Sequence, residues 1–398
     1  MISQIMLQYF CMGDHEFLLG AATSSHQVEG NNTNNDWWAA EQKGLLPRSG
    51  EASGHNSRFE EDNSLAHSIG LNAMRLSLEW SRLEPLPGQY DAVSWDHYRQ
   101  ELSDLKQKGF SIFLTLHHFT LPVWAAERGG FFSSFVRSRF LEFAEKSITE
   151  FDDLVDCWVT INEPQIYGVM SYFNGAWPPF HRSLFEFLRL NLILIKLHKQ
   201  TYSSIKKLSP QARVGIAKNN AVYIGRTSSL QDTLMVKFFD YLRNFYFLNS
   251  ISKYQDFIGL NYYFTFKVGF PNKGLDITTT ESPKTDLNWP INPEGLYQIL
   301  KSLKKFNVPI YITENGLADK NDILREGYIE SHIRSALKAK NAGVDVRGYF
   351  YWSLMDNFEW ADGFEPRFGL IEINYSNLER RVRDSAKVFK RLKQELNL

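Results

Sequence analysis

Short apolar runs rich in β-branched residues alternate with longer amphipathic segments along this chain. The apolar runs have the composition of buried parallel strands, in which strict alternation is lost because both faces of the sheet are covered. We predict strands at residues 17–22, 72–78, 110–116, 154–161, 212–217, 256–261, 308–313 and 346–354. The spacing of apolar positions predicts helices at residues 58–69, 94–108, 134–151, 184–208, 230–250, 294–305, 322–342 and 384–396.

Several predicted helices carry recognisable start and stop signals. Ser133 precedes the helix at 134–151, and Asn321 and Asp322 open the helix at 322–342. Gly109 and Gly343 lie where a glycine commonly ends a helix. These signals support the proposed alternation of strands and helices.

Eight strand–helix alternations in one chain predict an α/β fold, a single (β/α)₈ TIM barrel that occupies residues 1–398 as one domain. A chain of this length is compatible with one barrel. An open doubly wound sheet is the competing architecture, and it would usually show a glycine-rich phosphate loop after the first strand. The segment after the first predicted strand has only the widely spaced Gly20 and Gly30, which favours the barrel.

Two of the predicted strands end in a glutamate. The run at 308–313 stops at Glu314, and the run at 154–161 is followed by Asn162, Glu163 and Pro164. Polar residues often end strands for purely structural reasons. In a barrel, however, all strand C-termini open onto the same face, so Glu163 and Glu314 are expected to meet in one pocket.

The ends of the other predicted strands are also polar or aromatic. They carry Gln27, Glu29, Arg75, Glu79, Trp80, His117, His118, Asn261, Tyr262, Tyr263, Trp352, Asp356, Glu359 and Trp360. Glycoside cleavage needs one carboxylic acid to protonate the leaving oxygen and a second carboxylate that faces the anomeric carbon. Amides and carboxylates bridge sugar hydroxyls, and a Trp ring offers a flat apolar face to a sugar. These strand-end residues therefore favour a site that binds a sugar and cleaves a glycosidic bond.

Metal-dependent and serine-dependent hydrolysis fit the sequence less well. Adjacent residues on a strand point to opposite faces, so only one of His117 and His118 is expected to enter the pocket, and His117 is expected to pack in the core. The chain has no HxH, HExxH or G-x-S-x-G pattern. We therefore expect no metal and no cofactor.

Composition narrows the class of protein further. The net charge is −1, which favours neither nucleic acid nor an anionic membrane as a partner. The two cysteines, Cys11 and Cys157, are too few for a disulfide framework or a metal cluster. The first residues lack the basic region and cleavage site of a secretion signal, and no run reaches the roughly 18 apolar residues of a membrane span, so a cytoplasmic location is the default expectation.

The chain resembles the family 1 glycoside hydrolases, which are retaining β-glycosidases on a (β/α)₈ barrel. The resemblance runs nearly end to end and rests on SSHQVEG, RLSLEWSRLEP, LTLHHFTLPVW, TINEP, GLNYY, YITENG and WSLMDNFEWADGFEPRFGL. It implies that Glu163 is the general acid/base and Glu314 the nucleophile of a double displacement through a covalent glycosyl-enzyme. The implied partner is a small β-glycoside or an oligosaccharide.

The same resemblance implies roles for ten further residues. The residues implied to hold the sugar are Gln27, His118, Asn162, Trp352, Glu359 and Trp360, and the supporting residues are Arg75, Asn261, Tyr263 and Phe368. Arg75 and Tyr263 are expected to orient Glu314 and to keep its pKa low. A carboxylate at position 359 is expected to repel a phosphate, which favours neutral glycosides over 6-phospho-glycosides.

The chain departs from the family pattern in several places. Leu19 and Phe119 stand where the family commonly has Trp, and the chain is shorter around residues 230–255 and 264–293. We expect these differences to alter the wall of the sugar site and to leave a more open aglycone side. β-Glucosides are the expected substrates, with β-galactosides and β-fucosides as close alternatives, and transglycosylation and a non-catalytic sugar-binding barrel also remain open.

Overall fold

The structure is a computed structural model that describes residues 17–269 and 283–397. Cys11 and the middle of the 264–293 region lie outside the described residues. Eight parallel strands close into a barrel in the order in which they occur along the chain. They are β1 (Leu18–Ala22), β2 (Ala73–Ser77), β3 (Ser111–Thr115), β4 (Cys157–Asn162), β5 (Val214–Gly225), β6 (Phe257–Val268), β7 (Ile310–Asn315) and β8 (Val346–Trp352). The predicted α/β barrel is confirmed.

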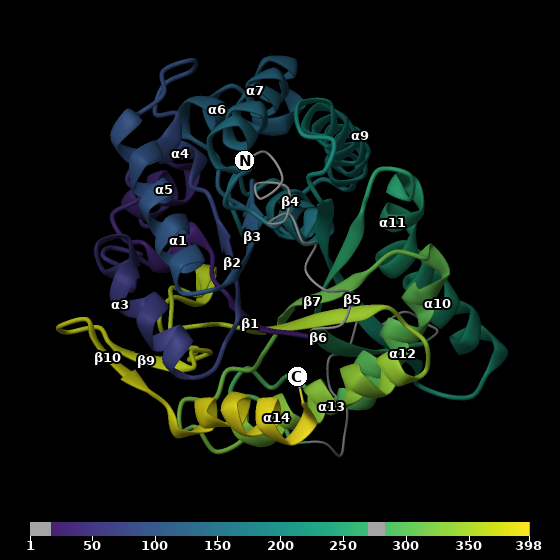
Figure 1. Ribbon diagram of the computed structural model, residues 1–398. Coiled ribbons are helices and arrows are strands. Elements are labelled where there is room, and N and C mark those ends of the chain that lie inside the picture. The colour runs from purple at the N-terminus through teal and green to yellow at the C-terminus, as the bar shows by residue number, and fades with distance from the viewer. Residues whose placement is uncertain (1–16, 270–282, 398) are drawn as a thin grey trace, which may run out of the picture.

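Helices surround the strands on the outside, as Figure 1 shows. The longer ones are α3 (His55–Ser68), α5 (Ala92–Gln107), α7 (Ser134–Phe151), α9 (Leu184–Leu208), α10 (Leu230–Asp240), α12 (Pro293–Leu303), α13 (Arg325–Asn341) and α14 (Val388–Leu396). All eight correspond to predicted helices. Among the described residues, no helix is both long enough and apolar enough to cross a membrane.

Short elements fill the connections, and the sequence pattern did not predict most of them. The short α-helices are α1 (Ser25–Val28), α2 (Asp36–Gln42), α4 (Trp80–Leu83), α6 (Val123–Glu127), α8 (Pro164–Gly168) and α11 (Tyr246–Ile251). The 3₁₀ and π turns are η1 (Gly130–Phe132), η2 (Val169–Phe173), η3 (Tyr241–Phe245), η4 (Lys304–Phe306), η5 (Trp360–Asp362) and η6 (Asp384–Lys387). A hairpin of β9 (Ile371–Asn374) and β10 (Glu379–Val382) follows β8.

Aromatic side chains fill the interior of the barrel beneath the strand C-termini. The ring centroid of Phe113 lies 4.7 Å from that of Phe350, 4.8 Å from Tyr311 and 5.9 Å from Phe257. Cys157 is buried in the same cluster. This close-packed layer is a rigid base for the strand ends above it.

Some predicted boundaries are wrong. Strands β5 and β6 continue past residues 217 and 261 and stay paired as far as Gly225 and Val268. The polar residues 218–220 suggested a strand end, but all three are buried. The predicted helix at 230–250 is interrupted by the π turn η3 between α10 and α11.

The predicted helix ends were partly right. Gly109 and Gly343 have φ angles of 81° and 80°, the left-handed conformation that a helix-ending glycine supplies. Ser133 precedes α7 but makes no capping hydrogen bond through its side chain. The helix predicted from residue 322 begins at Arg325, because the Asp322 carboxyl bonds to Arg325 and to the backbone N–H of Ser385 instead of capping a helix start.

Candidate active site

The C-terminal ends of the barrel strands open onto a cavity of about 430 Å³. Ten of the predicted site residues line it: Gln27, His118, Asn162, Glu163, Tyr263, Glu314, Trp352, Glu359, Trp360 and Phe368. The other two, Arg75 and Asn261, are completely buried and bond to residues in its wall. The structure therefore brings every predicted site residue together.

Glu314, at the end of β7, has a charged partner and a phenol partner. Arg75 Nη1 forms an ion pair with Oε1, and the Tyr263 hydroxyl donates a hydrogen bond of 2.9 Å to Oε2. Burial nevertheless raises the pKa of Glu314 to about 7, and the nearby charge of Glu163 adds to this rise. The expected low pKa is therefore wrong, because loss of hydration outweighs the opposing effects of Arg75 and Tyr263.

Arg75 joins three strands behind the cavity. Besides Glu314 on β7, its guanidinium bonds to Asn162 Oδ1 on β4 at 2.7 Å and to Thr115 Oγ1 on β3 at 3.2 Å. The planar guanidinium offers several donors in fixed directions, which is why an Arg can hold several acceptors in one arrangement. Arg75 is thus both a structural link and a direct neighbour of Glu314.

Glu163 has amide partners only. Asn261 Nδ2 and Asn219 Nδ2 donate to its Oε1 at 2.8 and 3.0 Å. No hydrogen bond to Oε2 occurs within the described parts of the chain. The backbone of Glu163 has a φ of 41°, an uncommon value for a residue with a side chain, and Pro164 starts α8 directly after it. The turn between β4 and α8 therefore sets where this carboxyl lies.

The two carboxyls face the same cavity from β4 and β7, but their surroundings differ. Glu314 has a cation and a phenol, whereas Glu163 has two neutral amide donors. A pair of titratable groups in unlike environments is the usual basis for giving two carboxyls different roles in acid–base chemistry.

Gln27, Glu359 and His118 form the polar end of the cavity. Gln27 Nε2 donates to Glu359 Oε2 at 3.2 Å, and Asn162 Nδ2 lies 3.0 Å from His118 Nε2. Gln27 Oε1 and His118 Nδ1 are buried and have no hydrogen-bond partner within the described chain. Burial and the Asp362 charge raise the pKa of Glu359 to about 8, and burial keeps the pKa of His118 well below its usual value. Gln27 Oε1 and His118 Nδ1 are therefore available to bind a polar ligand.

Aromatic rings form much of the remaining wall. The Trp352 and Trp360 rings lie 6.0 and 6.2 Å from the ring of His118 and nearly parallel to it. Phe119 lies 4.9 Å from Trp177 and 5.3 Å from Trp360. Phe119 thus belongs to the cavity wall, as expected for the position where the family commonly has Trp.

Three other carboxylates at strand ends do not reach this cavity. Glu29 pairs with Arg82 at 2.9 Å, and Asp356 pairs with Arg383 at 2.8 Å. Glu79 instead accepts hydrogen bonds from the hydroxyls of neighbouring residues. These carboxyls support the loops around the site and do not line it.

His117 and Tyr262 point away from the cavity, in contrast to His118 and Tyr263. His117 is buried 5.0 Å from the ring of Phe131, and burial lowers its pKa to about 3. Its predicted packing role is confirmed. The Tyr262 hydroxyl donates to the backbone carbonyl of Asn292 at 3.0 Å.

Sequence reasoning missed several lining residues. They are Ile166, Met170, Ala176, Trp177, Asn219, Phe264, Trp289, Ala361 and Asp362. The available signal for Asn219 was the polar run at 218–220 directly after the fifth predicted strand. Trp177 lies in a long connection, where hydrophobic periodicity and secondary-structure propensity do not show which way a side chain points.

The described residues do not form a metal site or a thiol site at this cavity. Among them, no group of three or more His, Cys, Asp or Glu side chains is placed to hold a metal ion. Cys157 lies in the barrel interior, where burial raises the pKa of its thiol.

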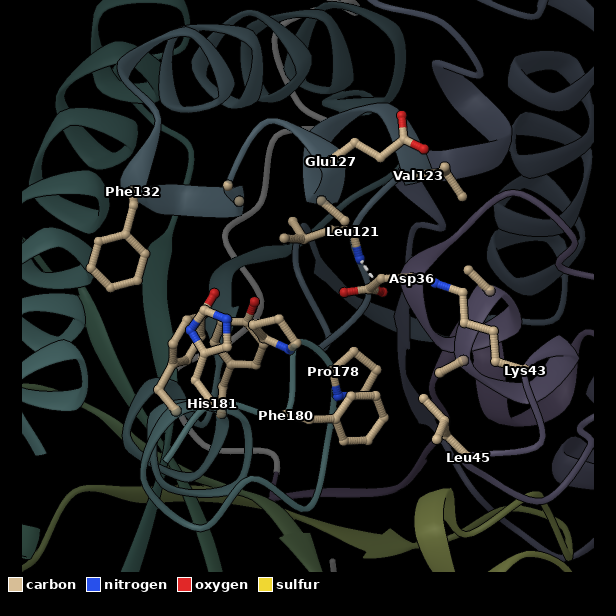
Figure 2. A pocket seen from close by; sticks show the side chains of 18 residues that line it. Asp36, Lys43, Leu45, Leu121, Val123, Glu127, Phe132, Pro178, Phe180 and His181 are labelled. Atoms are coloured by element: carbon tan, nitrogen blue, oxygen red, sulfur yellow. Dashed lines mark hydrogen bonds between the residues drawn. The ribbon is translucent and has the colours of Figure 1, made fainter. Parts of the chain in front are cut away.

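A second cavity, of about 380 Å³, lies beside α2 and α6 and is shown in Figure 2. Its walls are mainly apolar and include Leu121, Phe132, Pro178 and Phe180. Asp36 Oδ1 accepts a hydrogen bond of 2.9 Å from the backbone N–H of Leu121, and burial raises the pKa of Asp36 to about 8. None of the predicted site residues lines this cavity.

Comparison with known proteins places these features in one family. The sequence model described as glycosyl hydrolase family 1 matches residues 12–251 and 247–397. β-Glucosidase A of Thermotoga maritima is 31% identical over 422 residues, covering 93% of this chain and 95% of that protein. A β-galactosidase of Sulfolobus acidocaldarius is 31% identical over 448 residues, covering 90% and 89%. The solved structure of a β-glycosidase from Pyrococcus horikoshii matches with a TM-score of 0.90 and 38% identity, covering 94% and 93%.

Proposed function

The chain belongs to glycosyl hydrolase family 1 and is a glycoside hydrolase, and we propose that it is a retaining, exo-acting β-glycosidase that hydrolyses β-glucosides. The observation that carries this proposal is the pair of unlike carboxyls, Glu163 and Glu314, on one cavity. β-Galactosides and β-fucosides are further substrates in this proposal, because each differs from a β-glucoside in only a few hydroxyl positions.

Glu314 is the proposed nucleophile. In its ionised form it attacks the anomeric carbon and forms a covalent glycosyl-enzyme, while the leaving oxygen takes a proton from Glu163. The Arg75 guanidinium and the Tyr263 hydroxyl hold both oxygens of Glu314 and thereby orient the carboxyl for the attack. Because the pKa of Glu314 is about 7, the share of free enzyme with an ionised nucleophile rises through neutral pH.

Glu163 is the proposed general acid and base. Asn219 and Asn261 hold Oε1, so Oε2 is the oxygen that remains for the glycosidic oxygen. In the second step Glu163 takes a proton from water, which attacks the glycosyl-enzyme and restores the original configuration at the anomeric carbon. Retention requires a carboxyl separation of about 5–5.5 Å.

The polar end of the cavity is the proposed binding site for the terminal sugar. Gln27, His118 and Glu359 supply hydrogen-bonding groups for its hydroxyls, and Asn162 is the amide next to Glu163. Trp352 and Trp360 supply flat faces for its C–H groups. Phe368, which packs with Trp352, shapes the adjoining wall. Recognition of one terminal unit is what makes the enzyme exo-acting.

Neutral sugars are preferred over 6-phospho-sugars in this proposal. No Lys or Arg lines the cavity within the described residues, whereas Glu359 and Asp362 both do. A phosphate dianion would therefore lose its hydration without gaining a cation. Initial rates with a 6-phospho-glucoside and its unphosphorylated counterpart test this, and faster turnover of the phosphorylated compound contradicts it.

The leading experiment compares wild type with Glu314→Gln on nitrophenyl β-glucoside, β-galactoside and β-fucoside. We expect wild-type release of nitrophenol and a loss of about 10⁴-fold or more in kcat for the variant, as for other covalent nucleophiles. Glu29→Gln is the matched control, since Glu29 is a buried carboxyl outside the cavity, and it should retain the wild-type sugar ranking. No release from any β-glycoside by folded wild type contradicts the proposal.

The role of Glu163 has its own test. Glu163→Ala should retain activity mainly on substrates with a good leaving group, because the first step then needs no acid. Added azide should restore turnover and give a β-glycosyl azide, since a small anion needs no general base to attack the intermediate. A product of inverted configuration contradicts the double displacement.

A further inference from the structure

A chain of hydrogen bonds reaches the Glu163 carboxyl from outside the barrel through Asn219. Asn219 lies on β5, is buried, and donates from Nδ2 to Glu163 Oε1 at 3.0 Å. The other end of the same amide, Oδ1, accepts a hydrogen bond from Arg243 Nη2. A guanidinium has only donors, so Arg243 fixes which end of the Asn219 amide faces the catalytic carboxyl.

Arg243 comes from η3, the π turn that interrupts the helical segment between β5 and β6. Its guanidinium lies 5.5 Å from the centre of the Phe266 ring. Within the described residues, no carboxylate forms an ion pair with Arg243. The neighbours of the guanidinium are thus an aromatic face and the Asn219 amide, which leaves its donors free to hold that amide.

Lys218 holds the main chain at both Asn219 and Arg243. Its side chain is 1% exposed, and Nζ donates to the backbone carbonyls of Asn219 at 2.6 Å and of Arg243 at 2.7 Å. Because the Lys218 amino group contacts both main chains, it ties η3 to β5 at the position where Arg243 meets Asn219. Burial lowers the pKa of Lys218 well below its usual value, and the nearby Arg243 guanidinium lowers it further.

We propose that Arg243 is a positioning residue for Glu163 and that it acts through Asn219. The guanidinium keeps the Asn219 NH₂ group on Oε1, so that Oε2 of Glu163 is directed at the glycosidic oxygen. The inference rests on the proposed role of Glu163 as acid and base.

The second amide on Glu163 Oε1 has a comparable arrangement. Thr313 Oγ1 donates to Asn261 Oδ1 at 2.7 Å, and Asn261 Nδ2 in turn donates to Glu163 at 2.8 Å. A hydroxyl can also accept, so Thr313 alone does not determine the orientation of its amide. Asn261 Nδ2 also donates to Asn162 Oδ1, which accepts from Arg75, so a guanidinium stands behind each of the two amides on Glu163.

Removing Arg243 should change the pH dependence as well as the rate. The basic limb of kcat/KM reports the acid of the proposed mechanism, and loss of a donor to a carboxyl favours its protonated form, so this limb should move to higher pH. The titratable and charged groups around Glu163 are Arg75 on β2, His118 on β3, Lys218 on β5, Tyr263 on β6, Glu314 on β7, Glu359 after β8 and Arg243 on η3. Arg243→Met removes the guanidinium contact with Asn219 and also a positive charge near Lys218, and an Asn219→Ala background separates the two effects.

The experiment compares Arg243→Met with Arg189→Met. Arg189 also lies over a phenylalanine ring, 5.2 Å from the centre of Phe132, but on α9 and without a bond to a catalytic group. For Arg243→Met we expect about a tenfold loss of kcat/KM on a phenyl β-glycoside, the size of one lost hydrogen bond to a charged group. A dinitrophenyl β-glycoside should lose much less, and the basic limb of the profile should move to higher pH. Arg189→Met should match wild type in all three.

A double-mutant cycle tests whether Arg243 acts through Asn219. If it does, Arg243→Met in an Asn219→Ala background should add almost nothing to the shift of the basic limb. Fully additive shifts, or a profile of Arg243→Met that equals that of Arg189→Met, overturn the proposal. Arg243→Lys keeps a hydrogen-bond donor and should retain more of the wild-type kcat/KM than Arg243→Met. It keeps the test possible if Arg243→Met unfolds at the assay temperature.

Failure of the underlying function gives a different result. If Glu163→Ala shows the same dependence on leaving group as wild type, Glu163 is not the acid, whatever Arg243 does. If Glu163→Ala shows the expected dependence and Arg243→Met does not, only the positioning role is overturned.

Discussion

The active-site cavity and the second cavity beside α2 are similar in size and unlike in chemistry. Their volumes are about 430 and 380 Å³, and each contains a carboxyl whose pKa burial raises, to about 7 for Glu314 and about 8 for Asp36. Glu314 is paired with Arg75 and Tyr263. The protein partners of Asp36 are backbone N–H groups, those of Trp37 and Leu121.

The comparison shows that a perturbed pKa is not by itself a mark of catalysis. Burial, with a smaller contribution from the charge of Glu79, produces the shift at Asp36, and a structural carboxyl that caps backbone groups can have such a shift. What distinguishes Glu314 is the set of partners that can stabilise its ionised form, together with the second carboxyl on the same cavity. Single substitutions remove these partners one at a time.

The largest effect is expected from Arg75→Met. Losing one preorganised electrostatic partner in an active site typically costs about 10²–10³-fold in rate, and we expect a loss of that size in kcat/KM. The pKa of Glu314 should rise further above 7, so the acidic limb of kcat/KM against pH should move to higher pH.

Arg383→Met is the matched control for Arg75→Met. It breaks another buried pair, with Asp356, that does not line the cavity. It should lower the melting temperature and leave kcat/KM of the folded protein close to wild type. Equal losses of activity in the two variants would mean that stability, and not the partner of Glu314, limits the rate.

The fold was predictable from the sequence because its signals are local. Each strand is a continuous apolar run, and each outer helix is a periodic segment, so all eight of each were placed. The extension of β5 was missed because Lys218, Asn219 and Asn220 are polar. Their burial depends on partners such as Arg243 and Asn244, which are about 24 residues away in sequence.

Of the twelve predicted site residues, ten line the cavity, and the other two, Arg75 and Asn261, bond to residues in its wall. The pKa of Glu314 could not be predicted in the same way. The direction of its pKa shift depends on whether the effect of burial outweighs the effects of Arg75 and Tyr263. A sequence can identify these partners, but it does not give the degree of burial. The apolar lining by Ile166 and Met170 was missed because the sequence of a connection between strands does not show which side chains point into the cavity.

An intermediate effect is expected from Tyr263→Phe. The variant removes one hydrogen bond to Glu314 Oε2 and keeps the ring, so kcat/KM should fall about tenfold, consistent with ~1–1.5 kcal/mol. In wild type the acidic limb should lie well above the usual pKa of a carboxyl, as the pKa of about 7 for Glu314 implies. In the variant it should lie higher still, because the lost donor favoured the ionised form.

Tyr262→Phe is the matched control for Tyr263→Phe, because it removes a neighbouring tyrosine hydroxyl that does not contact Glu314. Its hydroxyl bonds to the backbone carbonyl of Asn292, outside the cavity. The pH profile of this variant should match wild type. A shift of the acidic limb in Tyr262→Phe as large as in Tyr263→Phe would show that the Tyr263 bond is not what holds Glu314.

The smallest effect on activity is expected from Asp36→Asn in the second cavity. An Asn carbonyl can accept the same backbone N–H groups from Trp37 and Leu121, so kcat and KM should stay at wild-type values. The effect should appear in stability. The pKa of Asp36 is about 8 in the folded protein against an ordinary 3.8, so between these values the folded state binds a proton that the unfolded state has lost. The wild-type free energy of unfolding therefore receives from Asp36 a contribution that is fully present at low pH and declines as pH rises toward 8.

Asp36→Asn removes this decline, and thermal melts from pH 4 to 9 provide the measurement. The difference in melting temperature between variant and wild type should grow in favour of the variant up to about pH 8 and then stay level. A difference that is constant with pH would mean that Asp36 titrates alike in the folded and unfolded states. A change in kcat would mean that the second cavity communicates with the active site, and the contrast between the two cavities would then no longer hold.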